Sequence, residues 1–359
     1  MKRISILIAI ALFAVTACED FLTKNPSDQV VADQAILTEQ DAEVALNGVY
    51  SGFKSASYYG RYFVANPDVQ TDQLQSVIGY SNQLGEMYKW SFLSDNGTIT
   101  AAWDIMYKVI VRASNIIDAL PNIEEGDSAT LVRIGAEARL ARAMAHFDLV
   151  KAFAEAYTQG DPNTNLGVPI ITTFELGEPE RNTVAEVYDF IRSEAVTARN
   201  ALAAEDVAHS SVFFNKASAS ALLARVSLYM GEWDDAVTYA TEVIDYGDGI
   251  FSLAPDSATL ASMYLNDEGP EVIFRIGLTK GDYDTRYIGY NYYDNSQGPP
   301  SSDYIPAEWI LNLFEADDYR RDVIFKAEET KYGWIWPLVW KYPGNPDFSA
   351  DRIPKVVGG

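Results

Sequence analysis

Apolar side chains recur at helical spacing along most of the chain beyond residue 30. The clearest set is spaced by four, three, four and three positions and consists of Trp103, Tyr107, Ile110, the small polar residue Ser114 and Ile117. This spacing places the set on one face of a single helix. Pro121 then ends the helix, because proline lacks a backbone N–H and its ring clashes with the preceding turn.

Two later segments carry helix start signals. Asp127 and Ser128 can cap a helix that runs from about residue 130 to residue 157. Thr183 followed by Glu186 has the spacing of a capping box, in which each side chain bonds to the other residue's backbone. We therefore expect a further helix from Thr183 to about Ala204.

The segment from Ser218 to Tyr246 predicts two antiparallel helices joined by a tight turn. Gly231 supplies that turn, since glycine adopts backbone conformations that other residues avoid. Ala224 and Ala236 are small enough to let the helices approach closely. The order of small and large residues fits a tetratricopeptide-like helix hairpin.

Beyond Gly247 the pattern changes, and Pro, Gly, Tyr and Asp become frequent. Only a strand-like segment from Glu271 to Ile276 and a short helical one from Tyr304 to Asp317 stand out. The sequence therefore predicts an all-α fold of tetratricopeptide-like stacked helix hairpins, with long irregular loops and a few short strands.

The N-terminus has the layout of a bacterial lipoprotein signal. Lys2 and Arg3 precede an apolar run from Ile4 to Phe13, which is too short to span a bilayer, and small residues lead to Cys18. We expect residues 1–17 to be a signal peptide, Cys18 to carry the lipid anchor, and residues 18–30 to form a tether. Cys18 is the only cysteine, so no intramolecular disulfide is possible.

Charge and motifs exclude several function classes. The 51 acidic and 27 basic residues give a net charge of −24, which repels nucleic acid and anionic lipid headgroups. No nucleophile-elbow, zinc-protease or phosphate-loop motif occurs. His146 and His209 are the two histidines, and neither has a partner at metal-ligand spacing. We therefore expect no enzyme activity, no bound metal and no cofactor other than the lipid.

Several blocks, taken in order, resemble a SusD/RagB family nutrient-uptake lipoprotein of the outer membrane. They are Cys18–Leu22 with Pro26, Trp103–Asn115, Glu137–Val150, Gly167–Pro169, Leu222–Gly231, Glu271–Phe274 and Leu313–Arg320. The resemblance implies a lipid-anchored protein that faces the cell exterior, binds an oligo- or polysaccharide or another nutrient, and delivers it to a SusC-like TonB-dependent transporter. It also implies a helical N-terminal region over residues 31–250 and a C-terminal ligand-loop region over residues 251–359.

The chain departs from the family at its end. Family members usually continue with a helix pair that bears arginine and glutamate, whereas this sequence stops at Gly359. We therefore expect a C-terminal region that is either truncated or a short variant.

A saccharide site needs exposed aromatic rings beside hydrogen-bonding side chains, because sugars present flat C–H faces and rings of hydroxyls. The segment from Gly281 to Tyr304 has this composition, and family members often draw ligand-binding aromatics from that region. A second aromatic segment includes Trp90, with Asp72 upstream. The predicted ligand-binding residues are Tyr283, Tyr287, Tyr290, Asn291, Tyr292, Tyr293, Asn295, Trp90 and Asp72.

Two other functions stay open at this point. An all-α glycan-cleaving enzyme would need two carboxyl groups about 5 to 9.5 Å apart, which a sequence cannot reveal. A tetratricopeptide-like scaffold that binds other proteins would account for the hairpins but not for the tyrosine-rich segment. We assign Trp334, Trp336 and Trp340 to the core or to an unfinished apolar flank, because they sit among Ile335, Leu338 and Val339 near the chain end.

Overall fold

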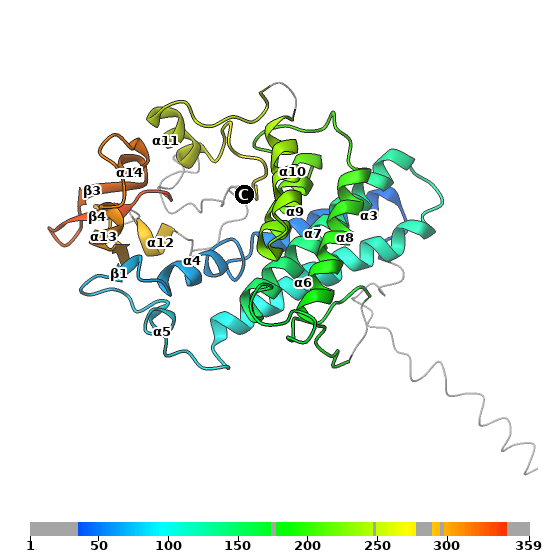
Figure 1. Cartoon of the computed structure of the whole chain (residues 1–359), viewed down its shortest axis with the longest axis horizontal. Helices are drawn as coiled ribbons and strands as arrows, with labels where there is room; N and C mark the ends of the chain where they lie inside the picture. The colour runs from blue at the N-terminus through cyan, green and yellow to red at the C-terminus, as the bar shows by residue number, and fades with distance from the viewer. Residues whose placement is uncertain (1–34, 174–176, 247–248, 278–288, 295–297, 343–359) are drawn as a thin grey trace, which may run out of the picture.

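The computed structural model describes residues 35–173, 177–246, 249–277, 289–294 and 298–342. Its helices and strands gather into two regions, on the right and the left of Figure 1. The first region, here the helical stack, consists of α3 (Glu39–Phe53), α6 (Gly97–Ala119), α7 (Ser128–Phe153), α8 (Val184–Ala201), α9 (Lys216–Met230) and α10 (Trp233–Ile244). The second region, here the loop lobe, contains the remaining short elements.

The helices of the stack begin at side chains that satisfy their first backbone N–H groups. Asn96 accepts from the backbone of Thr98 at the start of α6, and Asp127 accepts from Thr130 at the start of α7. Thr183 and Glu186 form the predicted capping box of α8. The expected helices over these three segments are therefore confirmed, although α7 ends at Phe153 and not near residue 157. The helix ends there because the backbone becomes extended at Ala154. Arg181 donates to the carbonyl of Phe153.

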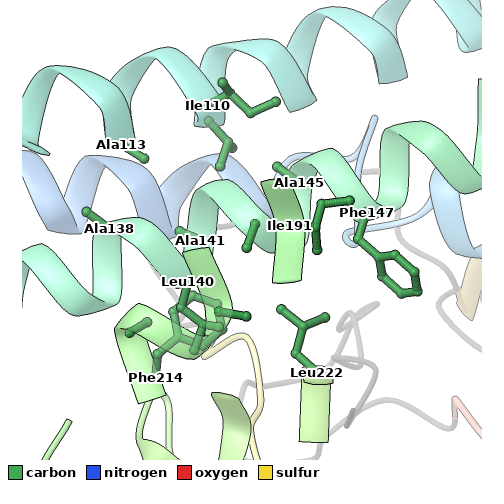
Figure 2. Close-up of a cluster of buried hydrophobic side chains, with 14 of the residues drawn as sticks. Ile110, Ala113, Ala138, Leu140, Ala141, Ala145, Phe147, Ile191, Phe214 and Leu222 are labelled. Atoms are coloured by element: carbon green, nitrogen blue, oxygen red, sulfur yellow. The ribbon is translucent and has the colours of Figure 1, made fainter. Parts of the chain in front are cut away.

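The predicted hairpin is also confirmed. Gly231 has a φ of +77° and joins α9 to α10. Each helix of the stack packs on its neighbours, so one continuous core runs between them. Figure 2 shows the centre of this core, where small alanines of α6 and α7 face larger side chains. The labelled residues are Ile110, Ala113, Ala138, Leu140, Ala141, Ala145, Phe147, Ile191, Phe214 and Leu222. The protein thus has the expected all-α fold with tetratricopeptide-like stacking.

Charged groups buried in the stack are hydrogen-bonded, which offsets the cost of removing them from water. Asp148 on α7 accepts from the hydroxyls of Tyr58 and Tyr59 at 2.6 and 2.7 Å, and it pairs with Lys151 at 2.9 Å. Glu194 on α8 pairs with Arg142 on α7 at 2.6 Å. These contacts tie α7 to α8 and to the segment that follows α3.

The loop lobe is built from short elements far apart in the sequence. They are α4 (Tyr62–Val69), β1 (Leu74–Ser76), α5 (Gly85–Tyr88), α11 (Ser257–Asn266), α12 (Gly289–Tyr292), β2 (Tyr304–Pro306), α13 (Glu308–Leu311), α14 (Tyr319–Ile324), β3 (Phe325–Glu329) and β4 (Ile335–Val339). A 3₁₀ turn, η2 (Leu120–Asn122), extends α6 in the stack. β1 pairs with β2 and β3 pairs with β4, both antiparallel.

Two expectations for this part of the chain are wrong. The segment from Glu271 to Ile276 forms no strand and makes one isolated bridge, between Phe274 and Ser211. Tyr304 begins a strand and not a helix, since β2 pairs with β1 before the single turn of α13 follows. Pairing with the distant strand β1 determines the structure at Tyr304, and a local sequence pattern does not predict such pairing.

The lobe has its own small core. Its buried members come from α4, α5, α12, β2, β4 and the residues between them: Ala65, Val69, Leu84, Met87, Tyr292, Tyr304, Val339 and Tyr342. Among the described residues, none of the helices combines the length and the apolar character that a membrane span needs. The predicted signal peptide and tether lie outside those parts, and the domain boundaries stay predictions.

Candidate functional site

The structure places only some of the residues predicted to contact a ligand. Cys18, Tyr283, Tyr287 and Asn295 lie outside the described residues. Tyr290 belongs to α12, but its side chain is not among those described. The roles of all five stay predictions.

Asn291 and Tyr292 are buried at the centre of the loop lobe. Asn291 is 0% exposed and accepts at Oδ1 from Nε of Arg61 at 2.9 Å. Tyr292 is 1% exposed, donates its hydroxyl to Asp68 at 2.9 Å and stacks on the ring of Tyr342. Direct ligand contact requires exposed surface, so this burial favours a positioning role for both residues.

Tyr293 is half-buried and donates its hydroxyl to Glu328 on β3 at 2.9 Å. Burial raises the pKa of Tyr293, and the contact with Glu328 raises it further. Tyr293 therefore connects α12 to the β3–β4 hairpin and keeps part of its ring accessible.

Trp90 and Asp72, far from the tyrosine-rich segment in sequence, meet at one turn of the lobe. Trp90 is 68% exposed and donates its indole N–H to the carbonyl of Gln70 at 3.0 Å. Trp309, which the sequence analysis did not select, is 47% exposed and donates its indole N–H to the carbonyl of Asp72 at 3.1 Å. We call these residues, with the exposed Asp72 side chain, the Trp90–Trp309 surface.

The β1–β2 pairing brings Trp309 to this turn. Leu74 lies opposite Pro306, and the backbone N–H of Ala307 donates to the carbonyl of Gln73 at 2.8 Å. α13 starts directly after this contact and carries Trp309 beside Asp72. Because the two carbonyl acceptors are two residues apart, the indole nitrogens lie within about 13 Å of each other.

Trp90 is held in an uncommon backbone conformation. Its φ is +54°, in the left-handed region that residues other than glycine rarely adopt. The turn after α5 fixes it there, since the N–H of Trp90 donates to Met87 and that of Ser91 donates to Glu86. Strain of this kind persists where surrounding contacts over-determine the backbone, which is frequent at binding sites.

Polar contacts across the lobe hold the segment that precedes Trp90. The backbone N–H of Ser81 donates to Asp303 at 2.7 Å, and the hydroxyl of Tyr304 donates to the carbonyl of Gln83 at 2.7 Å. Arg61 also donates to the side chain of Gln83. Asn291 is therefore linked to this segment through the same arginine.

Burial raises the pKa of Asp68, two residues before Gln70, and the hydrogen bond from Tyr292 opposes that rise. The Trp90–Trp309 surface itself offers two indole faces and the carboxylate of Asp72. Such a combination can stack on apolar faces and accept hydrogen bonds from hydroxyls.

Trp334 does not belong to the core, which leaves the other expectation for it, an unfinished flank, as a prediction. Trp334 is 64% exposed, because it lies in the turn between β3 and β4 and not within either strand. Trp336 and Trp340 are half-buried. In the described parts of the chain, no group of three or more His, Cys, Asp or Glu side chains is placed to hold a metal ion.

Comparisons with known proteins point to one family. A family model described as "SusD-like_3: Starch-binding associating with outer membrane" matches residues 20–228. The chain is similar to SusD-like proteins P38 and P2 of Formosa agariphila, with 27% and 25% identity over 95% and 98% of this chain. It spans 65% and 70% of the lengths of those two relatives. A crystal structure of a SusD superfamily protein from Bacteroides thetaiotaomicron matches with a TM-score of 0.76 and 28% identity, over 88% of this chain and 72% of that one.

Proposed function

The chain belongs to the SusD-like family, and from this membership we propose that it binds carbohydrate through the Trp90–Trp309 surface. The family model describes starch-binding proteins that associate with the outer membrane, and it covers most of the helical stack and the segment that contains Trp90. This membership supports a saccharide as the ligand class, and the exposed indoles support the loop lobe as the part of the chain that holds it.

One observation carries the location of the site. Two exposed indoles are fixed by backbone carbonyls of the same turn, at Gln70 and Asp72. These bonds satisfy the polar edge of each ring and limit its rotation, so little side-chain entropy is lost when a sugar stacks on it. Asp72 adds an acceptor for hydroxyl groups beside the rings.

We further propose that the protein is lipid-anchored at Cys18 and works with a SusC-like TonB-dependent transporter on the outer membrane. The lipoprotein-signal layout before Cys18 supports the anchor, and the family description supports the outer membrane. A single shallow surface gives modest affinity, which suits a protein that must release its ligand to a transporter. Tyr283, Tyr287, Tyr290 and Asn295 are proposed as further contacts that extend the surface.

We propose that the protein binds the saccharide without cleaving it. The runner-up, a glycan-cleaving enzyme, would need a proton donor and a second carboxyl group across the scissile bond. Among the residues that define the Trp90–Trp309 surface, Asp72 alone carries a carboxylate. Product analysis on every bound glycan separates the two functions.

The test is a binding screen of the protein from residue 19 onward against soluble starch, laminarin and other polysaccharides. For a glycan that binds, Trp90→Ala and Trp309→Ala should each weaken affinity by about tenfold or more, since a truncated aromatic anchor typically costs over 1 kcal/mol. Trp233→Ala is the matched control, because this tryptophan is similarly exposed, at 64%, but lies on α10.

Two results would overturn this assignment. Equal affinity in the wild type and both lobe variants would move the site away from the Trp90–Trp309 surface. Release of shortened oligosaccharides would replace the binding function with an enzymatic one. Far-UV circular dichroism should be unchanged in all three variants, because each replaced side chain is exposed.

A further inference from the structure

The Trp90–Trp309 surface carries a carboxylate that no described cation neutralises. Asp72 is exposed, and within the described part of the chain its side chain forms no ion pair and no hydrogen bond. The two indoles lie on either side of it, because Trp309 donates to the carbonyl of Asp72 itself and Trp90 donates to that of Gln70. A saccharide that stacks on both rings therefore lies close to this carboxylate.

The backbone that carries Asp72 is fixed on both sides. The backbone N–H and the hydroxyl of Thr71 both donate to the carbonyl of Asp68, at 3.3 and 2.8 Å. On the other side, the N–H of Ala307 donates to the carbonyl of Gln73 at 2.8 Å. These bonds hold the backbone in place, so the carboxylate stays at the surface when a ligand approaches.

The charged residues next to the two indoles do not offset the charge of Asp72. Glu308, directly before Trp309, is exposed and adds a second carboxylate. Lys89, directly before Trp90, has its ammonium 5.9 Å from the centre of the Tyr80 ring and forms no ion pair with Asp72. The whole chain has a net charge of −24, which extends the negative field around the surface.

Saccharides fall into two classes that interact differently with such a surface. Neutral glycans carry hydroxyl groups, which can donate to the Asp72 carboxylate in charge-assisted hydrogen bonds. Polyanionic glycans carry uronate or sulfate groups on many of their sugar residues, so a chain that stacks on both rings brings one of these groups near Asp72. Like charges repel each other there. The same side chain therefore favours one class of ligand and disfavours the other.

We propose that Asp72 is a specificity-determining residue, which makes the Trp90–Trp309 surface select uncharged saccharides and exclude those with uronate or sulfate groups. This inference rests on the saccharide function proposed above and adds the class of ligand. The indoles contribute affinity for both classes, because the C–H faces of the sugar rings are apolar in both. Asp72 supplies the difference in affinity between the classes.

Matched pairs of ligands isolate the effect of charge. They are maltoheptaose and laminariheptaose, each compared with a derivative whose primary hydroxyls are oxidised to carboxylates, so that linkage and chain length stay the same. Isothermal titration calorimetry at about 10 mM salt, where the Debye length is about 30 Å, should show at least about tenfold weaker binding of the oxidised derivative. The difference should shrink at about 1 M salt, where the Debye length is about 3 Å.

Asp72→Asn assigns this difference to one side chain. The amide has the shape of the carboxylate without its charge, so the oxidised derivative should bind at least about tenfold more tightly than it binds to the wild type. The neutral heptasaccharide should instead bind a few-fold less tightly, because its charge-assisted hydrogen bonds become neutral ones. A damaged surface would weaken the binding of both ligands, so opposite changes identify the role of the charge.

Glu125→Gln is the matched control for overall charge. Glu125 is exposed between η2 and α7, and α6, about 35 Å long, separates it from the end at which Asn96 contacts Glu86 of the lobe. This variant removes the same charge far from the surface. It should change neither affinity.

Three results would overturn the proposal. They are equal binding of the neutral and oxidised glycans to the wild type, equal gains for the oxidised glycan in Asp72→Asn and Glu125→Gln, and saturable binding of alginate that Trp90→Ala abolishes. The proposed function fails separately: if Trp90→Ala leaves the affinity for a neutral glycan unchanged, the saccharide site lies elsewhere. If that affinity falls in Trp90→Ala but the oxidised glycan binds equally well to the wild type, only the inference on Asp72 fails.

Discussion

The helical stack and the loop lobe are held together by contacts of very different range. In the stack, consecutive helices pack on one another, and α6 with α7, α7 with α8 and α9 with α10 are the main pairs. In the lobe, hydrogen bonds join Arg61 to Asn291, Asp68 to Tyr292 and Asp72 to Trp309, across 230, 224 and 237 residues. The stack is therefore held by contacts between helices that are neighbours in the sequence, and the lobe by contacts between segments that are far apart in it.

This difference assigns the two regions different tasks. Short segments join α6 to α7 and α9 to α10, so these pairs form at low entropy cost and give the stack a stable scaffold. The exposed indoles instead lie where distant segments meet, so their positions depend on both halves of the lobe. The proposed saccharide surface is therefore more easily disturbed than the helices that carry it.

The largest expected effect comes from the core of the stack. Ile110→Ala removes a side chain that is 0% exposed and packs between α6 and α7 (Figure 2). The free energy of unfolding should fall by about 4 kcal/mol, from lost burial and the cavity left behind. Thermal melts followed by far-UV circular dichroism measure the change.

The comparison also predicts what this substitution leaves intact. Saccharide affinity of the folded Ile110→Ala protein should equal that of the wild type, because the Trp90–Trp309 surface rests on lobe contacts. Val132→Ala on α7, where the side chain is 50% exposed, is the control and should change stability little. A large loss of affinity at a temperature where the variant is folded would show that the two regions are coupled.

Local signals account for what could be predicted from the sequence. Two such signals each span only a few neighbouring residues: the capping box of Thr183 and Glu186, and the turn at Gly231. Both elements are present in the structure as expected. Trp309 was missed because its neighbour Asp72 reaches it only through strand pairing. Trp309 lies in a short apolar segment of the kind that usually forms a core, so no local pattern distinguishes it from a buried residue.

The exposure of Trp233, Val237 and Ile244 on α10 was missed for the opposite reason. These residues have the helical spacing that normally indicates a buried face. α10 instead packs on α9 through a different side, which includes the small residue Ala236 and the buried Val243. Periodicity reports which residues share a face, and it does not report whether another helix covers that face.

A second prediction concerns acid. His146 in the stack is 0% exposed, and burial, with a smaller contribution from the Arg142 charge, lowers its pKa to about 4. Between pH 4 and 6.5 the unfolded chain binds more protons at this site than the folded one, so stability rises with pH. His146 should therefore cost the stack up to about 3 kcal/mol as the pH falls through that window.

His146→Gln isolates this contribution. Glutamine can still donate near the Arg142 carbonyl and accept from Ile171, as the histidine nitrogens do, but it does not titrate. Glu137 has a raised pKa, from burial, and acts in the opposite direction, so the difference between the two proteins is the quantity to measure. Urea unfolding at several pH values should give a shallower acid loss in His146→Gln. Parallel curves would contradict a neutral buried histidine.

The smallest expected effect tests the long-range contacts of the lobe directly. Tyr292→Phe keeps the ring stacked on Tyr342 but removes the hydroxyl that donates to Asp68. A buried carboxylate that loses a donor costs about 1 to 2 kcal/mol. Because this bond joins α12 to α4, whose last turn leads to Gln70, hydrogen exchange should speed up in α4 and β1 and stay unchanged in α7.

Tyr88→Phe is the matched control, since Tyr88 also packs on a neighbouring ring, that of Tyr304, while its hydroxyl has no hydrogen bond within the described residues. Saccharide affinity should fall a few-fold in Tyr292→Phe and stay constant in Tyr88→Phe. If exchange and affinity are equal in both variants, apolar packing alone orders the lobe. The hydrogen bonds between residues far apart in the sequence would then be a consequence of that packing. The stack and the lobe would differ only in the length of the segments that connect their elements.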